Sequence, residues 1–224
     1  MGQKTEKQEK IKFEKFYAAD KGKEALAWHH QKPNRFIASV HESRSEPGTA
    51  IDLGCGSGVD TVAMAKLGWT VTGLDFMEKA VVMSKEMAEQ EGVSVDYHCA
   101  NAFDWPEDTQ YDFVLDSGLL HNLPREEIAK YKKKLLALLK PDGDLVLAHW
   151  ASNGDHDRLF GGPRRASKEQ IVNLFAPEFS SLVEYDEKNV RMCKTCEGKT
   201  CDNEGKFCSG IGPDLTVGYY WFRR

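Results

Sequence analysis

A strand followed by a glycine-rich turn is the most constraining feature of this chain. Residues 51–58 read Ile-Asp-Leu-Gly-Cys-Gly-Ser-Gly, and residues 71–75 read Val-Thr-Gly-Leu-Asp. Closely spaced glycines let the main chain approach a ligand where a Cβ atom would clash. An acid at the end of the second strand can hold both hydroxyls of a ribose. The two segments together predict a strand, a turn, a helix and a second strand that bind a nucleoside-containing cofactor.

The spacing inside the turn indicates which class of cofactor fits. The glycines are Gly54, Gly56 and Gly58, whereas a dinucleotide turn has the form Gly-x-Gly-x-x-Gly. Asp52 precedes the first glycine, and its charge would repel a diphosphate but not the cationic tail of a methionine derivative. A nicotinamide-dependent oxidoreductase, an alternative from another class, would need the longer spacing and a tolerant residue at position 52.

Apolar strands alternate with helical patterns along most of the chain, which predicts a parallel sheet with helices on both faces. The predicted strands cover residues 49–54, 69–75, 93–98, 111–116, 144–149, 180–186 and 216–222. The predicted helices cover residues 58–67, 76–91, 124–139 and 168–175, after two short helices between 11 and 40. We interpret residues 1–45 as a helical lid segment and residues 46–224 as one doubly wound α/β domain, with a four-cysteine insertion at 191–214.

Five segments carry a family resemblance. They are Asp52–Asp60, Val71–Phe76, Asn101–Pro106, Tyr111–Pro124 and Gly162–Arg165. Over about residues 11–186 and the final strand, the chain is similar to class I S-adenosylmethionine-dependent methyltransferases, in the small-molecule branch of tellurite-resistance and thiopurine methyltransferase-like proteins. The resemblance implies a Rossmann-like sheet of about seven strands whose last strand is antiparallel. It also implies methyl transfer to a small-molecule acceptor by in-line displacement, with S-adenosylmethionine as the cofactor.

The resemblance also assigns cofactor contacts. Asp52 would lie near the ammonium group, Asp75 would hold the ribose, and Asp116 would lie near the methionine moiety and the reacting methyl group. The glycine turn would shape the floor of the site. Four residues would contact the adenine: Phe76, Met77, Asn101 and Ala102. Asp52 could instead only cap the turn, and Phe76 could be core packing. Asp60 is expected to cap or solvate the first helix of the domain.

Polar residues follow two predicted strands at the edge where substrates bind in open α/β sheets. His121 and His149 are candidate general bases, although a lone histidine is more often structural. Arg164, next to Arg165, could bind an anionic or thiolate acceptor through its planar guanidinium. A salt bridge to a surface acid is the alternative for Arg164. Residues 29–30, both histidines, belong either to the lid or to a solvated helix.

Four of the six cysteines lie close together near the C-terminus. They are Cys193, Cys196, Cys201 and Cys208. Four thiolates can close a tetrahedral zinc site of structural type. Disulfides, free thiols and a site for soft metals or metalloids are the alternatives. In the family that the chain resembles, this connection emerges beside the cofactor, so the loop would border the active site. Cys55 and Cys99 are expected to be small buried residues.

The net charge, the apolar stretches and one motif of the chain argue against several classes of function. The formal net charge is −5, so a field that attracts nucleic acid is absent and no nucleic-acid partner is expected. No apolar stretch approaches the roughly 20 residues that span a bilayer, and the start lacks a signal core, so we expect a cytoplasmic protein without a membrane partner. A protein or RNA methyltransferase is less favoured, because Asp116-Ser-Gly-Leu replaces an Asn/Asp-Pro-Pro-Tyr type of motif. A non-catalytic metal-responsive or interaction protein on the same scaffold stays open, as do the acceptor atom and the oligomeric state.

Overall fold

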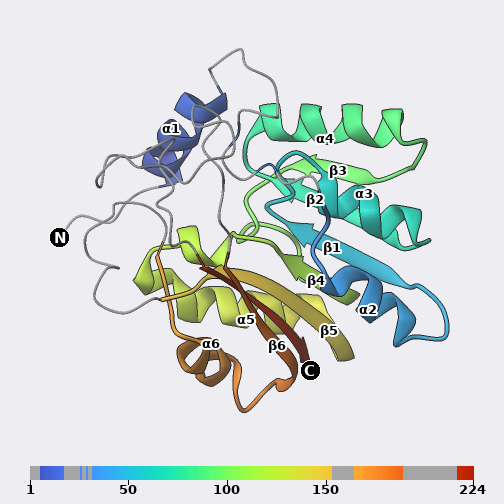
Figure 1. Cartoon of the computed structure of the whole chain (residues 1–224). Helices are drawn as coiled ribbons and strands as arrows, with labels where there is room; N and C mark the ends of the chain where they lie inside the picture. Colours follow the sequence, from blue (N-terminus) through green and yellow to red (C-terminus); the bar gives the residue numbers. More distant parts are fainter. Residues whose placement is uncertain (1–5, 18–25, 27–28, 30–31, 153–163, 189–215) are drawn as a thin grey trace.

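The computed structural model describes residues 6–17, 26, 29, 32–152, 164–188 and 216–224. Within these residues, seven strands form one sheet in the order β3-β2-β1-β4-β5-β7-β6 (Figure 1). In chain order they are β1 Thr49–Leu53, β2 Thr70–Asp75, β3 Asp96–Cys99, β4 Tyr111–Asp116, β5 Leu139–Trp150, β6 Ser180–Lys188 and β7 Thr216–Arg223. The seven strands predicted from the sequence are therefore present.

Strand directions follow the prediction as well. β1 pairs in parallel with β2 and β4, and β2 pairs in parallel with β3. β5 is parallel to β4, whereas β7 is antiparallel to both β5 and β6, between which it lies. The predicted Rossmann-like sheet with an antiparallel last strand is confirmed. Because parallel strands end at the same edge, the carboxyl ends of β1, β2, β4 and β5 face one region, where ligands bind in such sheets.

Helices cover both faces of the sheet, as predicted. α2 (Phe36–Glu42), α3 (Val59–Lys66) and α4 (Glu78–Gln90) lie on one face, and α5 (Ile128–Leu138) and α6 (Lys168–Phe175) lie on the other (Figure 1). α1 (Glu6–Tyr17) lies apart from the sheet. None of the helices described here has the length and apolar content that crossing a bilayer requires.

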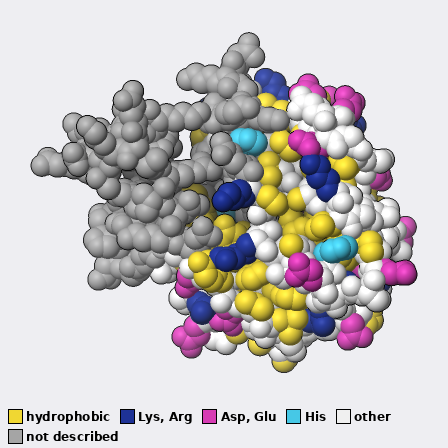
Figure 2. All heavy atoms as spheres, turned by 45° about the vertical axis from the view of Figure 1, so that its right-hand side comes forward, with side chains coloured by type: hydrophobic (Ala, Val, Ile, Leu, Met, Phe, Trp, Pro, Cys, Tyr) yellow, Lys and Arg dark blue, Asp and Glu magenta, His cyan; other side chains and the backbone are white. Residues whose placement is uncertain are grey.

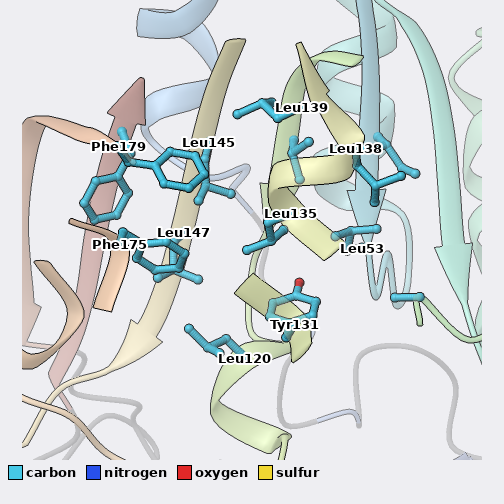
Figure 3. Close-up of a cluster of buried hydrophobic side chains, with 14 of the residues drawn as sticks. Leu53, Leu120, Tyr131, Leu135, Leu138, Leu139, Leu145, Leu147, Phe175 and Phe179 are labelled. Carbon is cyan, nitrogen blue, oxygen red and sulfur yellow. The ribbon is translucent and has the colours of Figure 1, made fainter. Parts of the chain in front are cut away.

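Apolar side chains of the central strands alternate between two cores. Leu145 and Leu147 of β5 pack on the face that carries Leu135 of α5 (Figure 3). Val146, between them in sequence, packs in the opposite core together with Val40 of α2. Neighbouring strand residues point to opposite faces, so strands covered on both sides are apolar throughout. The contact of Val40 also makes α2, within the segment predicted as a lid, a part of the domain core.

Two predicted boundaries differ from the structure. Residues 140–143, predicted as a turn because they read Lys-Pro-Asp-Gly, lie within the bounds of β5 but as an irregular segment: the β5 partner moves from Leu139 to Asp144 between Tyr111 and Phe113, and Asp142 has a φ of 60°. Tertiary contacts hold them there: the ammonium of Lys140 donates to the Asp112 carboxylate at 2.9 Å, and the Arg224 amide donates to the Gly143 carbonyl at 3.0 Å. The helix predicted from residue 124 begins as a 3-10 turn, η3 (Arg125–Glu127), before α5.

A buried carboxylate fixes the end of the sheet opposite to the predicted site. Asp144 of β5 is fully buried. Its Oδ2 accepts from the Arg44 Nε at 2.7 Å, and its Oδ1 accepts from the Trp221 Nε1 at 2.8 Å and from the Arg223 Nε at 2.9 Å. Two guanidinium groups therefore neutralise one buried charge, and they tie the residues after α2 to β5 and β7.

Candidate cofactor and acceptor site

The glycine turn leaves the carboxyl end of β1 and leads into α3. Gly54, Gly56 and Gly58 all adopt positive φ angles, of 79°, 55° and 85°, a region that residues with a Cβ rarely enter. The turn is held by the carbonyl of Leu74 on β2, which accepts from the amides of Gly54 and Cys55, both at 2.8 Å.

Gly58 serves packing between helices and not only the approach of a ligand. A Cβ atom at position 58 would lie 2.9 Å from the Cα of Ser84 on α4. At Gly54 the nearest atom to such a Cβ is the Leu119 Cβ at 3.6 Å, an ordinary contact. At Gly58 the missing side chain therefore also lets α3 and α4 approach each other, whereas the approach of a ligand to the three glycines stays a prediction.

Asp75 ends β2 beside the glycine turn. Its Oδ2 accepts from the Gly56 amide at 3.0 Å and its Oδ1 accepts from the Met77 amide at 2.8 Å. Burial raises the pKa of Asp75 to about 6, and the two amides oppose that shift. Each carboxylate oxygen offers two lone pairs, so both can still accept a ribose hydroxyl. The position fits the role that the sequence predicts.

Asp52 lies two residues before Gly54, at the carboxyl end of β1. It is 2% exposed, and its Oδ2 accepts from the Thr61 hydroxyl at 2.5 Å. Burial, followed by the charge of Asp60, raises the pKa of Asp52 well above its ordinary value. The carboxyl group is therefore more than a surface cap of the turn, because it is enclosed behind the turn.

Asp116 ends β4 and organises the loop that follows. Its oxygens accept from the amides of Gly118 at 2.9 Å, Leu119 at 2.6 Å and Leu120 at 3.0 Å, and from the Tyr131 hydroxyl at 2.9 Å. Burial raises the pKa of Asp116 to about 6 against these hydrogen bonds. Its direct effect is to shape the loop on which His121 stands, whereas its predicted proximity to the reacting methyl group stays a prediction.

Four carboxyl groups thus gather at the carboxyl edge of the sheet. Asp52, Asp60, Asp75 and Asp116 are all buried. Within the described chain, no lysine or arginine forms an ion pair with Asp52, Asp75 or Asp116. Uncompensated buried acids are costly. The site is therefore arranged for a ligand that brings positive charge or hydrogen-bond donors.

The segment before α2 contacts both loops of this edge. The Asn34 amide donates to the Asp60 carboxylate at 2.6 Å, and the Asn34 Nδ2 donates to the Ser117 hydroxyl at 3.2 Å. The His29 Nδ1 lies 2.8 Å from the Ser57 hydroxyl of the glycine turn. Asp60, expected at the solvated start of a helix, is instead buried and holds the N-terminal segment against the domain.

The residues predicted to contact adenine lie after β2 and after β3. The Phe76 ring packs edge-on against the Phe13 ring of α1 at 5.5 Å, and Met77 is buried with Ala80 in a small apolar cluster. The Asn101 Oδ1 accepts from the Phe103 amide at 3.0 Å. The last member of the predicted set, Ala102, belongs to the main core. Phe76 and Asn101 are partly exposed, whereas Met77 and Ala102 are mostly enclosed by protein, and contact of these residues with adenine stays a prediction.

The two described cysteines differ. Cys55 is buried, as predicted, with its sulfur 3.7 Å from the Ser84 hydroxyl. Cys99 is predicted as buried but is exposed, because it is the last residue of β3, which is an edge strand. Its thiol lies 3.7 Å from the Phe76 carbonyl.

The predicted acceptor residues come together beyond β4 and β5. The rings of His121 and His149 are 5.5 Å apart at 81°. Arg164 donates from its amide to the His121 carbonyl at 2.8 Å and from a guanidinium nitrogen to the Leu120 carbonyl at 2.9 Å. Burial and the charge of Arg125 lower the pKa of Arg164. Arg164 is thus built into the wall of the site and is not paired with a surface acid in the described structure.

His149 is held as a neutral imidazole. It is 0% exposed, and its Nδ1 lies 2.8 Å from the Trp150 carbonyl, so this nitrogen carries the proton. Burial lowers the pKa of His149 to about 4, and the charge of Arg164 acts in the same direction. Its Nε2 finds no hydrogen-bond partner among the described residues.

Several predictions fall outside the described residues. These are the cysteines at 193, 196, 201 and 208, the insertion at 191–214, the Gly-Gly-Pro run before Arg164, and His30. No group of histidine, cysteine or acidic residues that could hold a metal occurs in the part of the chain that the structure describes.

Sequence reasoning missed two contributors to the site. Asn34 carries no motif, and only the fold brings it to Asp60 and Ser117. Tyr220 reads as one of several aromatic residues in an apolar strand, yet its hydroxyl is buried and has no hydrogen-bond partner among the described residues. The signal in the sequence is Gly218, two residues before Tyr220, because a glycine inside a strand often marks a place where another group lies close to the backbone.

Comparison with known proteins agrees with this geometry. Residues 50–143 match the family described as methyltransferase domain. Ubiquinone biosynthesis O-methyltransferase of Coxiella burnetii is 34% identical over 99 residues, which cover 44% of this chain and 42% of that protein. The match therefore spans less than half of the relative.

Two solved structures share the fold. The N-methyltransferase NodS of Bradyrhizobium japonicum, in complex with S-adenosyl-L-homocysteine, superposes with a TM-score of 0.69 at 13% identity, over 96% of this chain and 97% of that one. TehB of Haemophilus influenzae gives a TM-score of 0.66 at 17% identity, over 87% and 63%. The chain therefore has the fold of these methyltransferases, and its residues 50–143 match the methyltransferase-domain family.

Proposed function

We propose that this protein transfers a methyl group from S-adenosylmethionine to a small-molecule acceptor. The observation that carries the proposal is the group of buried carboxyls around the glycine turn. S-adenosylmethionine brings a sulfonium and an ammonium, which stabilise nearby carboxylates, whereas a dinucleotide would bring a diphosphate that they repel. The matched methyltransferase domain supports the same cofactor.

Each element of the site has a defined part in this proposal. Asp75 binds the ribose hydroxyls, Asp52 attracts the ammonium, and the loop shaped by Asp116 borders the methyl group. The sulfonium is already an excellent leaving group, so the protein needs to align the acceptor, bring it close and exclude water. His121, His149 and Arg164 form the wall at which the acceptor binds.

A small molecule is the acceptor class that we favour. On the face shown in Figure 2, side chains of both charge signs are interspersed around a group of hydrophobic ones, so this face offers no basic stripe for a nucleic acid. The name of the Coxiella relative suggests an oxygen acceptor, and the fold shared with TehB supports the tellurite-resistance branch. The acceptor class rests on these similarities and on the wall of the site.

Calorimetric titration with S-adenosylmethionine and S-adenosylhomocysteine tests the cofactor. Asp75→Asn removes the charged acceptor of the hydrogen bonds from the ribose hydroxyls. It should weaken the binding of both ligands about 10- to 100-fold. Asp96→Asn, at a carboxylate that is 70% exposed on β3, is the matched control and should leave binding unchanged. Binding of NADH in place of either ligand, or equal affinities for both variants, would contradict the proposal.

Methyl transfer itself is tested by mass spectrometry with a panel of thiol, hydroxyl, amine and metalloid acceptors. A mass gain of one methyl group in one acceptor class would identify the reacting atom. A protein that binds the cofactor tightly and methylates no member of the panel would favour a non-catalytic role on the same scaffold.

We also propose that the four-cysteine loop binds zinc in a structural site. The support is the sequence alone, because a Cys-x-x-Cys pair followed by two more cysteines at short spacing suits a tetrahedral ion. Native mass spectrometry should show a mass excess of one zinc, which a chelator removes. A chain that takes up no zinc, with or without reductant, would refute this site.

A further inference from the structure

Two buried polar side chains lie on the same face of neighbouring strands at the acceptor end of the sheet. His149 of β5 pairs with Gly218 of β7, and Tyr220 follows Gly218 by two residues. Residues two apart in a strand point the same way, and Tyr220 packs with the core that carries Leu135 of α5. His149, Gly218 and Tyr220 therefore face the α5 side together.

The tyrosine hydroxyl occupies the space that a side chain at position 218 would fill. A Cβ atom on Gly218 would lie 2.5 Å from the Tyr220 Oη. Directly opposite residues of an antiparallel pair have their Cβ atoms about 5 Å apart. The Tyr220 ring thus extends along β7 over Gly218, the residue that pairs with His149 on β5.

Both side chains have hydrogen-bonding capacity to spare. Neither the His149 Nε2 nor the Tyr220 Oη has a hydrogen-bond partner among the described residues, although the two side chains are 0% and 1% exposed. The proton on the His149 Nδ1 is directed at the Trp150 carbonyl, so the Nε2 is an acceptor. Tyr220 supplies a donor. Buried polar atoms are nearly always paired, so these two atoms suit a ligand that offers both a donor and an acceptor.

The Arg164 side chain provides a third buried polar atom in addition to those of His149 and Tyr220. The Arg164 Nε is buried and also lacks a hydrogen-bond partner in the described structure, while its backbone amide and another guanidinium nitrogen hold the loop around His121. The wall therefore presents one acceptor and two donors. Aromatic rings surround it, since His121 lies 5.5 Å from the Trp150 ring and Tyr220 stacks on Phe222.

We propose that the His149 Nε2 and the Tyr220 Oη form the subsite that binds the reacting hydroxyl of an oxygen acceptor. The acceptor hydroxyl donates to the His149 Nε2 and accepts from the Tyr220 hydroxyl, and the Arg164 Nε donates to a second oxygen of the same molecule. This inference rests on the proposed methyl transfer and names its acceptor class.

The chemistry balances without a further reactant. The acceptor oxygen attacks the methyl carbon, the carbon–sulfur bond breaks, and its electron pair stays on the sulfur of S-adenosylhomocysteine. The hydroxyl proton passes to the His149 Nε2 and then to water. As the new oxygen–carbon bond forms, that proton becomes strongly acidic, so a weakly basic imidazole is sufficient to accept it.

Binding of catechol to the protein saturated with S-adenosylhomocysteine tests the subsite. We expect catechol to bind and to shift the Nε2 resonance of His149 in nitrogen-detected spectra of the histidine rings. Tyr220→Phe, which removes one hydrogen bond, should weaken catechol binding about three- to tenfold. Tyr219→Phe, on the opposite face of the same strand, is the matched control and should bind catechol like the original protein.

The outcomes of these measurements distinguish a failure of the subsite from a failure of the proposed methyl transfer. Failure of S-adenosylhomocysteine to bind would remove both. Binding of S-adenosylhomocysteine with no shift at His149 on addition of catechol, or equal catechol affinities for Tyr220→Phe and Tyr219→Phe, would overturn the subsite alone. Tighter binding of thiophenol than of catechol would also overturn it, since a thiol is a poor partner for both atoms. Thermal unfolding of Tyr220→Phe should match the original protein, because the lost hydroxyl has no described partner.

Discussion

Replacement of Gly58 by alanine tests the finding that this position of the turn serves helix packing. Gly58 has a φ of +85°, and a Cβ there would lie 2.9 Å from the Ser84 Cα and 3.0 Å from the Ser84 Cβ. Because one of these atoms belongs to the backbone of α4, a rotamer change cannot relieve the contact. Either α3 or α4 has to move.

The expected cost has two parts. A residue other than glycine in the left-handed region costs about 1–2 kcal/mol. Overpacking a close contact costs about 1–3 kcal/mol more. Gly58→Ala should therefore lower the free energy of unfolding by about 2–5 kcal/mol, a large share of the 5–15 kcal/mol that is typical of a domain.

Gly92 supplies a matched control. It has a φ of +67°, and a Cβ there would meet nothing within 4 Å. Gly92→Ala should cost only the backbone part, about 1–2 kcal/mol. Guanidinium titration of both variants without cofactor measures the difference. Equal losses within about 0.5 kcal/mol would refute the packing role of Gly58.

Three further predictions concern the buried carboxyls and their contacts. Asp144→Ala should lower the free energy of unfolding by about 3–5 kcal/mol, because it leaves two arginines and Trp221 without their shared acceptor. Asp104→Ala, on an exposed loop, is the control and should change the free energy of unfolding by less than about 0.5 kcal/mol. Asp75 and Asp116 each have a pKa of about 6 in the fold against an ordinary value of 3.8, so their contribution to stability without cofactor is full below pH 4 and is lost as the pH rises through about 6. S-adenosylmethionine affinity should rise over the same window, since its cationic groups favour the ionised carboxyls, and a flat calorimetric profile from pH 5 to 7 would contradict this. Asn34→Ala removes the side-chain hydrogen bonds to Ser117 and to the Phe36 amide but keeps the backbone bond to Asp60, so it should cost about 1–3 kcal/mol in a denaturant titration, and an unchanged midpoint would show that these two side-chain bonds do not stabilise the segment before α2.

The local pattern of the sequence was sufficient for the frame of the site. Glycines at 54, 56 and 58 and the acid at 75 define a strand, a turn and a second strand through backbone conformation and strand period, which neighbouring residues fix. The family resemblance also predicted the antiparallel β7. Residues 140–143 keep their turn character, with a positive φ at Asp142, and the sequence did not predict that β5 continues on both sides of this segment.

The enclosure of individual side chains came only from the tertiary structure. Asp60 and Cys99 exchange their expected environments: the acid is buried under Asn34, and the thiol is exposed on an edge strand. Burial depends on which segments meet across the chain, and the residues of one strand or helix do not specify it.

By itself, the sequence determined that the chain forms a doubly wound sheet with a nucleoside-cofactor turn, because these features follow from local conformational preferences and from periodic burial. Only the tertiary structure decided that the buried side chains of His149 and Tyr220 lie on the same face of neighbouring strands. That pairing joins two strands distant in sequence, and it exists because β7 runs antiparallel against β5 and places Gly218 opposite His149.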